Sequence, residues 1–259
     1  MNVVRTVQDA RAALDPSRAT GSRIGLVPTM GAFHAGHLTL FGAACAECDL
    51  VVVSLFVNPA QFGHAGDLAS YPRDEERDVA LAREAGVDLL FAPTDDELYP
   101  EGFQTWVEVE ELGAILEGEF RPAHFRGVAT VCCKLFNIVR PDVAYFGQKD
   151  AQQVEVIRRM VRDLDLELEI RVVPTVRDED GLALSSRNVL LAPEDRERAR
   201  ALPRALATRD ARRAHTLLED LEVDYVAVAP FDPPVLAAAV RVGGVRLIDN
   251  VPLDEGGTQ

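Results

Sequence analysis

The sequence has no long apolar run, few cysteines and no cluster of basic residues. A helix that crosses a bilayer needs roughly 18 or more consecutive apolar residues, so we expect no membrane span. The amino-terminal segment MNVVRTVQDARAAL is interpreted as a polar-faced helix and not as a secretory signal peptide. The expected compartment is therefore the cytoplasm.

Positive charge is scarce as well. Lys and Arg total 27 against 42 Asp and Glu, which gives a formal net charge of -15. Binding to a phosphate backbone requires basic side chains gathered on one face, and here every basic stretch is interrupted by acidic or apolar residues. We therefore expect no nucleic-acid partner, and any anion that the protein binds must be held by local groups.

Four cysteines are too few for a disulfide framework in 259 residues, and we expect all four to be free thiols. Cys45 and Cys48 form a C-x-x-C pair, which can belong to a small-residue helix packed on a sheet or to a redox or metal site. No second cysteine pair and no histidine pair lies at zinc-binding spacing. This favours the structural interpretation.

Strand-like and helix-like runs alternate along most of the chain, which is typical of a parallel sheet with crossover helices. The runs VVVSLFV and DLLFA are apolar on both faces, as expected for interior strands. After about Pro174, a charged helix opening at Pro193 and two strands, VDYVAVAP and VRLIDN, predict a smaller domain. The fold class is therefore α/β, with a Rossmann-like parallel-sheet domain over residues 1–175 and a carboxy-terminal α/β lid domain over residues 176–259.

The segment PTMGAFHAGH, residues 28–37, lies between the first core strand and the first crossover helix. This is where open α/β sheets bind nucleotides, because the N–H groups at the helix start favour an anion. Gly31 and Gly36 allow a phosphate to approach the backbone. His34 and His37, spaced as H-x-G-H, can both donate to triphosphate oxygens as charge builds during transfer.

A second strand end carries Lys149, Asp150 and Gln153. Lys149 can bind phosphate, Asp150 can accept from ribose hydroxyls, and the Gln153 amide can bind a carboxylate or hydroxyl group. The alternative is that Asp150 is only a helix N-cap and Lys149 a solvated surface residue. Gln61, which follows the second core strand, is a further polar group at the same edge of the sheet.

Two more segments carry candidate anion-binding groups. Ser185, Ser186 and Arg187 follow a turn signal at Asp180-Gly181 and can form a lid that holds a leaving pyrophosphate, or else a simple turn. A basic cluster precedes the helix GVATVCCKLFNIV, where anion binding and helix capping are equally open. That cluster consists of Arg121, His124 and Arg126.

Together these segments resemble the pantothenate synthetase family, which belongs to the H-x-G-H nucleotidyltransferase superfamily. The resemblance extends from about Gly21 to Leu191 and resumes at VRLIDN. It is carried by VPTMGAFHAGHL, VVVSLFVNPAQF, DLASYPRDEERD, LEGEFRPAHFRGVATVCCKLFNIVRPD, YFGQKDAQQ, VIRRMVRDL and DGLALSSRN.

This resemblance implies ATP-dependent condensation of D-pantoate with β-alanine through a pantoyl-adenylate, giving pantothenate, AMP and pyrophosphate. It also implies Mg²⁺, whose protein ligands it does not name, and a homodimer. By position, His34, His37, Lys149 and Arg187 become the catalytic residues, and Gln61 and Gln153 hold the small substrates. The implied ATP contacts are Met30, Gly31, Ala32, Phe33, His34, Ala35, Gly36, His37, Gly147, Gln148, Lys149, Asp150, Val176, Leu184, Ser185, Ser186 and Arg187.

The chain departs from the family pattern at three places. Phe33 and Ala35 replace a more usual Leu and an acidic or polar residue, and Cys132 stands where valine is common. The stretch after about Arg198 is shorter than usual. Two other functions compete with the ligase: a nucleotidyltransferase acting on a phosphorylated acceptor, and a non-catalytic adenine-nucleotide sensor on the same fold.

Overall fold

The computed structural model describes residues 1–63 and 65–253, so the last six residues of the predicted lid domain lie outside it. The chain divides into two compact units. Unit 1 contains Met1–Phe33, His37–Phe146 and Val156–Val173, and unit 2 contains His34–Gly36, Gly147–Glu155 and the chain from Pro174 onward. Two short segments that follow strands of the first sheet thus group with the carboxy-terminal part.

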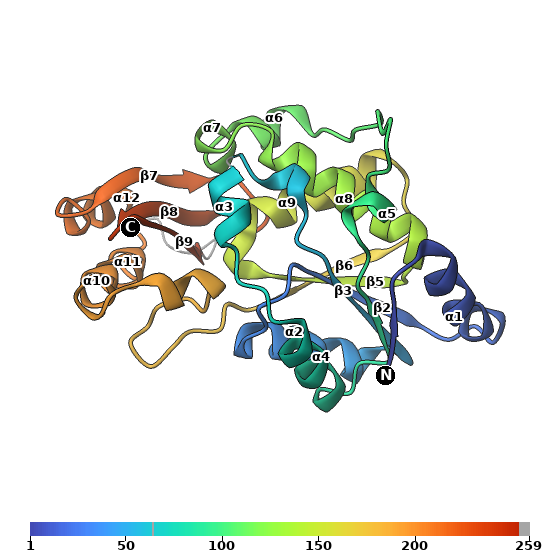
Figure 1. Ribbon diagram of the computed structural model, residues 1–259. Helices are drawn as coiled ribbons and strands as arrows, with labels where there is room; N and C mark the ends of the chain where they lie inside the picture. The colour runs from blue at the N-terminus through green and yellow to red at the C-terminus, as the bar shows by residue number, and fades with distance from the viewer. Residues whose placement is uncertain (64, 254–259) are drawn as a thin grey trace. The chain divides into compact units, whose positions relative to one another are not determined.

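Unit 1 is built on a six-stranded sheet in the order β1-β4-β3-β2-β5-β6 (Figure 1). The pairs β1–β4, β4–β3, β3–β2 and β2–β5 are all parallel, as the alternating pattern predicted. The two apolar runs form the interior strands β3 and β4. The strand bounds are β1 Asn2–Val4, β2 Ile24–Thr29, β3 Leu50–Leu55, β4 Leu89–Phe91, β5 Val143–Gly147 and β6 Glu169–Val173.

The prediction for the amino terminus was wrong in its first residues. Asn2–Val4 does not continue the helix but forms the edge strand β1, paired with β4 from Asn2↔Leu89 to Val4↔Phe91. The helix α1 begins only at Val7, where the Thr6 side chain accepts the N–H of Asp9. Two consecutive valines have a high strand propensity, so pairing with the edge of the sheet stabilises them more than an extra helical turn would.

Helices cover both faces of this sheet (Figure 1). The helices α2 (Ala35–Glu47) and α4 (Glu75–Glu84) lie on one face, and α8 (His124–Val139) lies on the other. The other helical elements with residues in unit 1 are α1 Val7–Ala19, η1 Pro59–Gln61, α3 Ala65–Ser70, α5 Asp95–Leu98, α6 Glu110–Ala114, α7 Glu117–Phe120 and α9 Ala151–Asp163. No helix of the described residues is long and apolar enough to cross a membrane.

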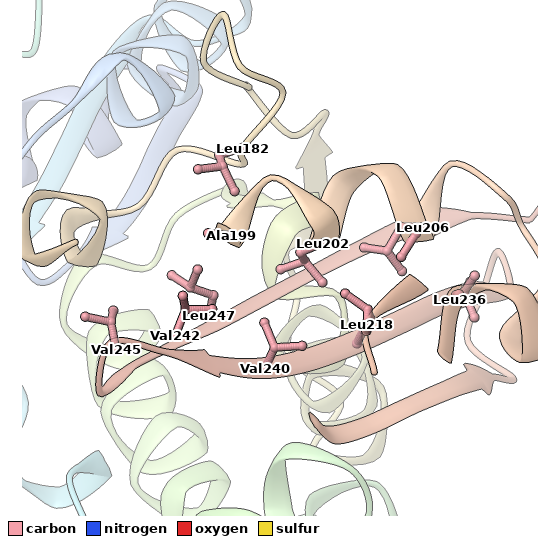
Figure 2. Close-up of a cluster of buried hydrophobic side chains, with 13 residues drawn as sticks. Leu182, Ala199, Leu202, Leu206, Leu218, Leu236, Val240, Val242, Val245 and Leu247 are labelled. Atoms are coloured by element: carbon pink, nitrogen blue, oxygen red, sulfur yellow. The ribbon is translucent and has the colours of Figure 1, made fainter. Parts of the chain in front are cut away.

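Unit 2 has its own antiparallel sheet in the order β7-β8-β9, covered by three short helices. Figure 2 shows leucine and valine side chains of helices and strands meeting in its core. The strands are β7 Glu222–Ala229, β8 Val235–Val242 and β9 Val245–Pro252, and the helices are α10 Pro193–Ala199, α11 Ala201–Leu206 and α12 Ala211–Leu217. The short 3-10 turns are η2 Gln148–Asp150 and η3 Ser186–Leu190.

The sequence predicted β7, β9 and a helix opening at Pro193, and it missed β8. The β8 sequence VLAAAVRV is rich in alanine, which has a low strand propensity. It is nevertheless a strand because it pairs on both sides, with β7 and with β9.

Close backbone contact joins α8 to η1 within unit 1. A Cβ atom on Gly127 of α8 would lie 2.3 Å from the carbonyl oxygen of Ala60 and 2.6 Å from the nitrogen of Gln61. Real Cβ atoms do not approach backbone this closely, so only glycine permits the contact. Gly127 therefore sets the position of the turn that carries Gln61.

We expect Gly127→Ala to destabilise the protein by about 1–3 kcal/mol, because the added methyl group overpacks against rigid backbone. The matched control is Gly42→Ala in α2, where a Cβ meets nothing within 4 Å. This control should instead stabilise the helix by about 0.5–1 kcal/mol. Urea unfolding of both variants measures the difference, and equal effects would contradict the steric role of Gly127.

Candidate active site

A buried carboxylate holds the loop that follows β2. Asp78 of α4 is 1% exposed, and its two oxygens accept the N–H groups of Ala32 and Phe33, each at 2.7 Å. The loop reaches this arrangement through positive φ values at Gly31 (87°) and Ala32 (53°). A Cβ on Gly31 would lie 2.9 Å from an Asp78 oxygen, so this glycine also makes room for the carboxylate. Sequence reasoning gave Asp78 no role.

Phe33 was predicted among the ATP contacts, but its side chain is fully buried in the core of unit 1. Its ring packs edge-on against Phe41 at 5.1 Å and lies 5.4 Å from the ring of His37, centroid to centroid. The Phe33 side chain is therefore closed to a ligand, and its N–H is already bound to Asp78. The aromatic ring instead supports the imidazole of His37.

The other histidine of the motif belongs to unit 2. The N–H of Gly36 donates to Nδ1 of His34 at 3.2 Å, so Nδ1 is an acceptor and the neutral ring carries its proton on Nε2. A Cβ on Gly36 would lie 3.0 Å from the imidazole. Glycine at this position thus lets the backbone bond to His34 and makes Nε2–H the donor of the ring.

Gln61 lies in a buried polar cluster of unit 1. The Asn58 amide donates to Oε1 of Gln61 at 2.9 Å, and the Tyr99 hydroxyl donates to Oδ1 of Asn58 at 2.9 Å. Burial raises the pKa of Tyr99, so its hydroxyl remains a donor. The Gln61 amide in turn donates to the Met30 sulfur at 3.1 Å. Asn58 and Tyr99 were missed, since one polar residue in a loop gives no distinctive sequence signal.

The helix α8 begins at His124, three residues earlier than predicted. His124 is buried, with Nδ1 at 2.8 Å from the carbonyl oxygen of Gln61 and Nε2 at 3.1 Å from Arg121. The carbonyl can only accept, so Nδ1 carries the proton and Nε2 accepts from the guanidinium. Arg126 lies over the ring of Trp106 at 4.6 Å. The helix cap is Ala123, which has no side-chain cap bond, so the capping alternative for this basic cluster was wrong.

The Lys149 loop belongs to unit 2 and follows β5. The ammonium of Lys149 pairs with the Asp150 carboxylate at 3.3 Å. Gly147 is the cap residue of η2, and Gln153 lies half-buried in the first turn of α9. The loop therefore presents a cation, a carboxylate and an amide within seven residues.

The Ser185–Arg187 segment follows a tight hairpin in unit 2. The N–H of Leu184 donates to the carbonyl of Val176 at 2.9 Å, and the predicted turn at Asp180-Gly181 is confirmed, with φ of 88° at Gly181. Ser185 caps η3 by accepting the N–H of Arg187 at 3.3 Å. The hairpin thus positions the start of the serine and arginine cluster.

All four cysteines are free, as expected. Burial raises the pKa of Cys48, whose sulfur lies 3.3 Å from the Tyr145 hydroxyl, and it raises the pKa of Cys45 as well. These thiols are not activated for redox chemistry, because a reactive cysteine needs a lowered pKa. Over residues 1–63 and 65–253, no group of three or more His, Cys, Asp and Glu side chains could hold a metal ion.

Comparisons with known proteins give a consistent result. The family model described as pantoate-beta-alanine ligase matches residues 2–252. A pantothenate synthetase of Heliobacterium modesticaldum is 49% identical over 280 residues, covering 98% of this chain and all of the relative. Pantothenate synthetase 1 of Bradyrhizobium diazoefficiens is 51% identical over 278 residues, covering 98% of each.

Solved structures agree with the sequence relatives. The crystal structure of pantothenate synthetase from Thermus thermophilus has a TM-score of 0.92 and 48% identity, covering 97% of this chain and 99% of that one. A pantoate-beta-alanine ligase from Francisella tularensis, complexed with beta-gamma ATP and beta-alanine, has a TM-score of 0.87 and 35% identity over 97% of both chains.

The buried Asp78 carboxyl predicts a pH dependence of stability. Burial raises its pKa above the ordinary value of 3.8, although its two N–H donors act in the opposite direction. The native state therefore binds this proton at a higher pH than the unfolded chain does. As pH rises through that interval, the contribution of Asp78 to the free energy of unfolding falls.

We expect the unfolding free energy of the parent, relative to Asp78→Asn, to decrease as pH rises from 3.8 upward, because the variant lacks this titration. Urea unfolding of both proteins across that range measures the difference. A difference that grows with pH would contradict the raised pKa.

Proposed function

This chain belongs to the pantoate–β-alanine ligase family, and on that premise we propose how its own residues carry out the reaction. It is an ATP-dependent ligase that joins D-pantoate to β-alanine and forms pantothenate, AMP and pyrophosphate. The two competing functions, a nucleotidyltransferase for phosphorylated acceptors and a nucleotide sensor, match neither the family model nor the relatives described above.

A carboxylate cannot acylate an amine directly, because its leaving group would be oxide. We propose that the pantoate carboxylate first attacks the α-phosphorus of ATP, so that the bond to pyrophosphate breaks and a pantoyl-adenylate forms. The β-alanine amine then attacks the acyl carbon, and AMP leaves. Neither step needs a protein nucleophile, so the protein supplies positioning, cations and hydrogen-bond donors for the developing charge.

One observation carries the assignment of the nucleotide residues. Unit 2 brings three segments that are far apart in the sequence into a single compact body: His34–Gly36, Gly147–Glu155 and the chain from Pro174, with its Ser185–Arg187 cluster. A Cβ on Gly36 would lie 3.9 Å from the Cβ of Leu184, so the first and third of these segments are neighbours. We propose that Nε2–H of His34, Lys149 and Arg187 bind the phosphates, with His37 as the proton donor.

We assign pantoate to Gln61 and Gln153. The Gln61 amide donates to a thioether sulfur, which is a weak acceptor, so exchanging this partner for a carboxylate or hydroxyl oxygen is favourable. The acceptor side of Gln61 is fixed by Asn58, which points the amide donors in one direction. For the ribose we propose Asp150, whose carboxylate is partly exposed beside Lys149.

We propose that Mg²⁺ acts together with ATP, since magnesium commonly keeps several waters and binds through substrate phosphates and one or two carboxylates. When bound, the ion would neutralise phosphate charge. We further propose a homodimer that works in the cytoplasm, a reducing compartment to which the four free thiols are suited.

The adenylate route predicts that labelled pyrophosphate exchanges into ATP when pantoate and Mg²⁺ are present and β-alanine is absent. Arg187→Ala should reduce this exchange as strongly as overall synthesis, because we place Arg187 on pyrophosphate. Exchange that requires β-alanine would refute the ordered route. Exchange without pantoate would mean that another acceptor takes the adenylyl group.

Removing His37 should lower kcat by about 10²–10³, the usual loss for one preorganised donor. Its control is His215→Ala, since His215 is an exposed residue of α12, a helix that carries none of the residues assigned to substrate. The control should keep the parent's turnover. Coupled detection of AMP formation measures both variants, and a His37→Ala protein with normal turnover and normal melting would remove His37 from the mechanism.

A further inference from the structure

We propose that Asn250 of β9 is a positioning residue for Lys149, which it controls by binding both peptide groups that flank the lysine. The inference rests on the proposed role of Lys149 in phosphate binding. It also explains what the motif VRLIDN does, since the proposed reaction gives no role to any residue of that motif. All the residues concerned belong to unit 2.

The contacts use every polar atom of the Asn250 side chain. The amide nitrogen donates to the carbonyl oxygens of Gln148 at 2.9 Å and of Lys149 at 2.8 Å. The amide oxygen accepts from Nε2 of Gln148 at 3.2 Å. Asn250 is 4% exposed, so these bonds are shielded from water, where losing a partner is costly.

The geometry explains why this clamp acts on Lys149 in particular. The Gln148 carbonyl belongs to the peptide group before the Lys149 Cα, and the Lys149 carbonyl belongs to the peptide group after it. Holding both carbonyls restrains the two backbone dihedral angles of Lys149. The direction of its Cα–Cβ bond, and hence the region that its ammonium can reach, follows from those angles.

The alternative support for Lys149 is its ion pair with Asp150 at 3.3 Å. The Asp150 side chain is 43% exposed, so water screens this ion pair, and partly exposed ion pairs contribute little. The pair restrains only the tip of the lysine. The bonds from Asn250 therefore determine the direction of the Lys149 Cα–Cβ bond more strongly than the ion pair does.

The neighbouring residue anchors a different segment from the opposite face of β9. Successive side chains of a strand point to opposite faces. Asp249, whose side chain is 1% exposed, pairs with Arg177 through two bonds of 2.6 and 3.1 Å, and Arg177 belongs to the hairpin that precedes Ser185. One dipeptide thus holds the lysine loop on one face and the hairpin on the other.

The test is a double-mutant cycle with Lys149. We expect Asn250→Asp, which places carboxylate oxygens against two carbonyls, to lower kcat about 10–100-fold, since a misplacement near 1 Å has effects of this size. Asn250→Ala and Asn250→Ser are made in parallel, because serine retains one donor. Asn137→Asp is the matched control: its exposed amide also donates to a backbone carbonyl, that of Cys133 at 2.9 Å, and its kcat should equal the parent's.

The decisive measurement is the further effect of Lys149→Ala in whichever Asn250 variant melts like the parent. If Asn250 acts only through Lys149, the double variant should have the kcat of Lys149→Ala alone. The further loss in kcat is then the full 10²–10³ expected in the parent divided by the 10–100-fold already lost at Asn250, which leaves about 10-fold. If the double variant instead loses the product of the two single losses in kcat, the proposal is overturned. Such independence is what a general structural defect at Asn250 would give. Failure of all three variants to fold would overturn it too. If Lys149→Ala alone retains parent turnover, the assigned role of Lys149 fails first, which is a separate and recognisable result.

Discussion

Where the strands of a parallel sheet end, the backbone hydrogen bonds between strands end too. The loops that follow, which must bind the ligand, therefore have to be held by other groups. In this protein the holding groups are buried polar side chains with every oxygen or amide engaged. Asp78 binds two consecutive N–H groups after β2, Asn58 binds Gln61 after β3, and Asn250 binds two carbonyls after β5. An unpaired group at any of these sites would cost stability. The stability of the fold and the geometry of the candidate site therefore depend on the same bonds.

The sequence predicts the strands of the sheet and the candidate ligand-binding loops better than it predicts the buried polar residues that hold those loops. The interior strand β3 is apolar apart from Ser54, which makes it recognisable as a strand. The loops around His34, Lys149 and Ser185 stand out because reactive side chains are dense there. Strand β1 is only three residues long, and β8 is mostly alanine and valine without alternation, so neither has a distinctive pattern. Both become strands because neighbouring strands are available to pair with them.

The buried polar residues that hold the loops differ in how far the sequence could have revealed them. Asp78 and Ala82 are the buried residues of α4, so an acidic residue on the apolar stripe was a detectable signal for the support of the first loop. Asn250 has a weaker signal, one polar pair at the end of an apolar strand. Its partners are backbone carbonyls about 100 residues earlier, and no side-chain pattern records them.

Strand β9 has a consequence for how the protein matures. A ribosome completes the sheet of unit 1 and the Lys149 loop well before it reaches Asp249 and Asn250. Until β9 pairs with β8, the lysine loop lacks its clamp and the serine hairpin lacks its carboxylate partner. A nascent chain can thus possess every residue that we assign to ATP and still be unable to arrange them. Competence for adenylation is acquired only once β9 has left the ribosome and docked.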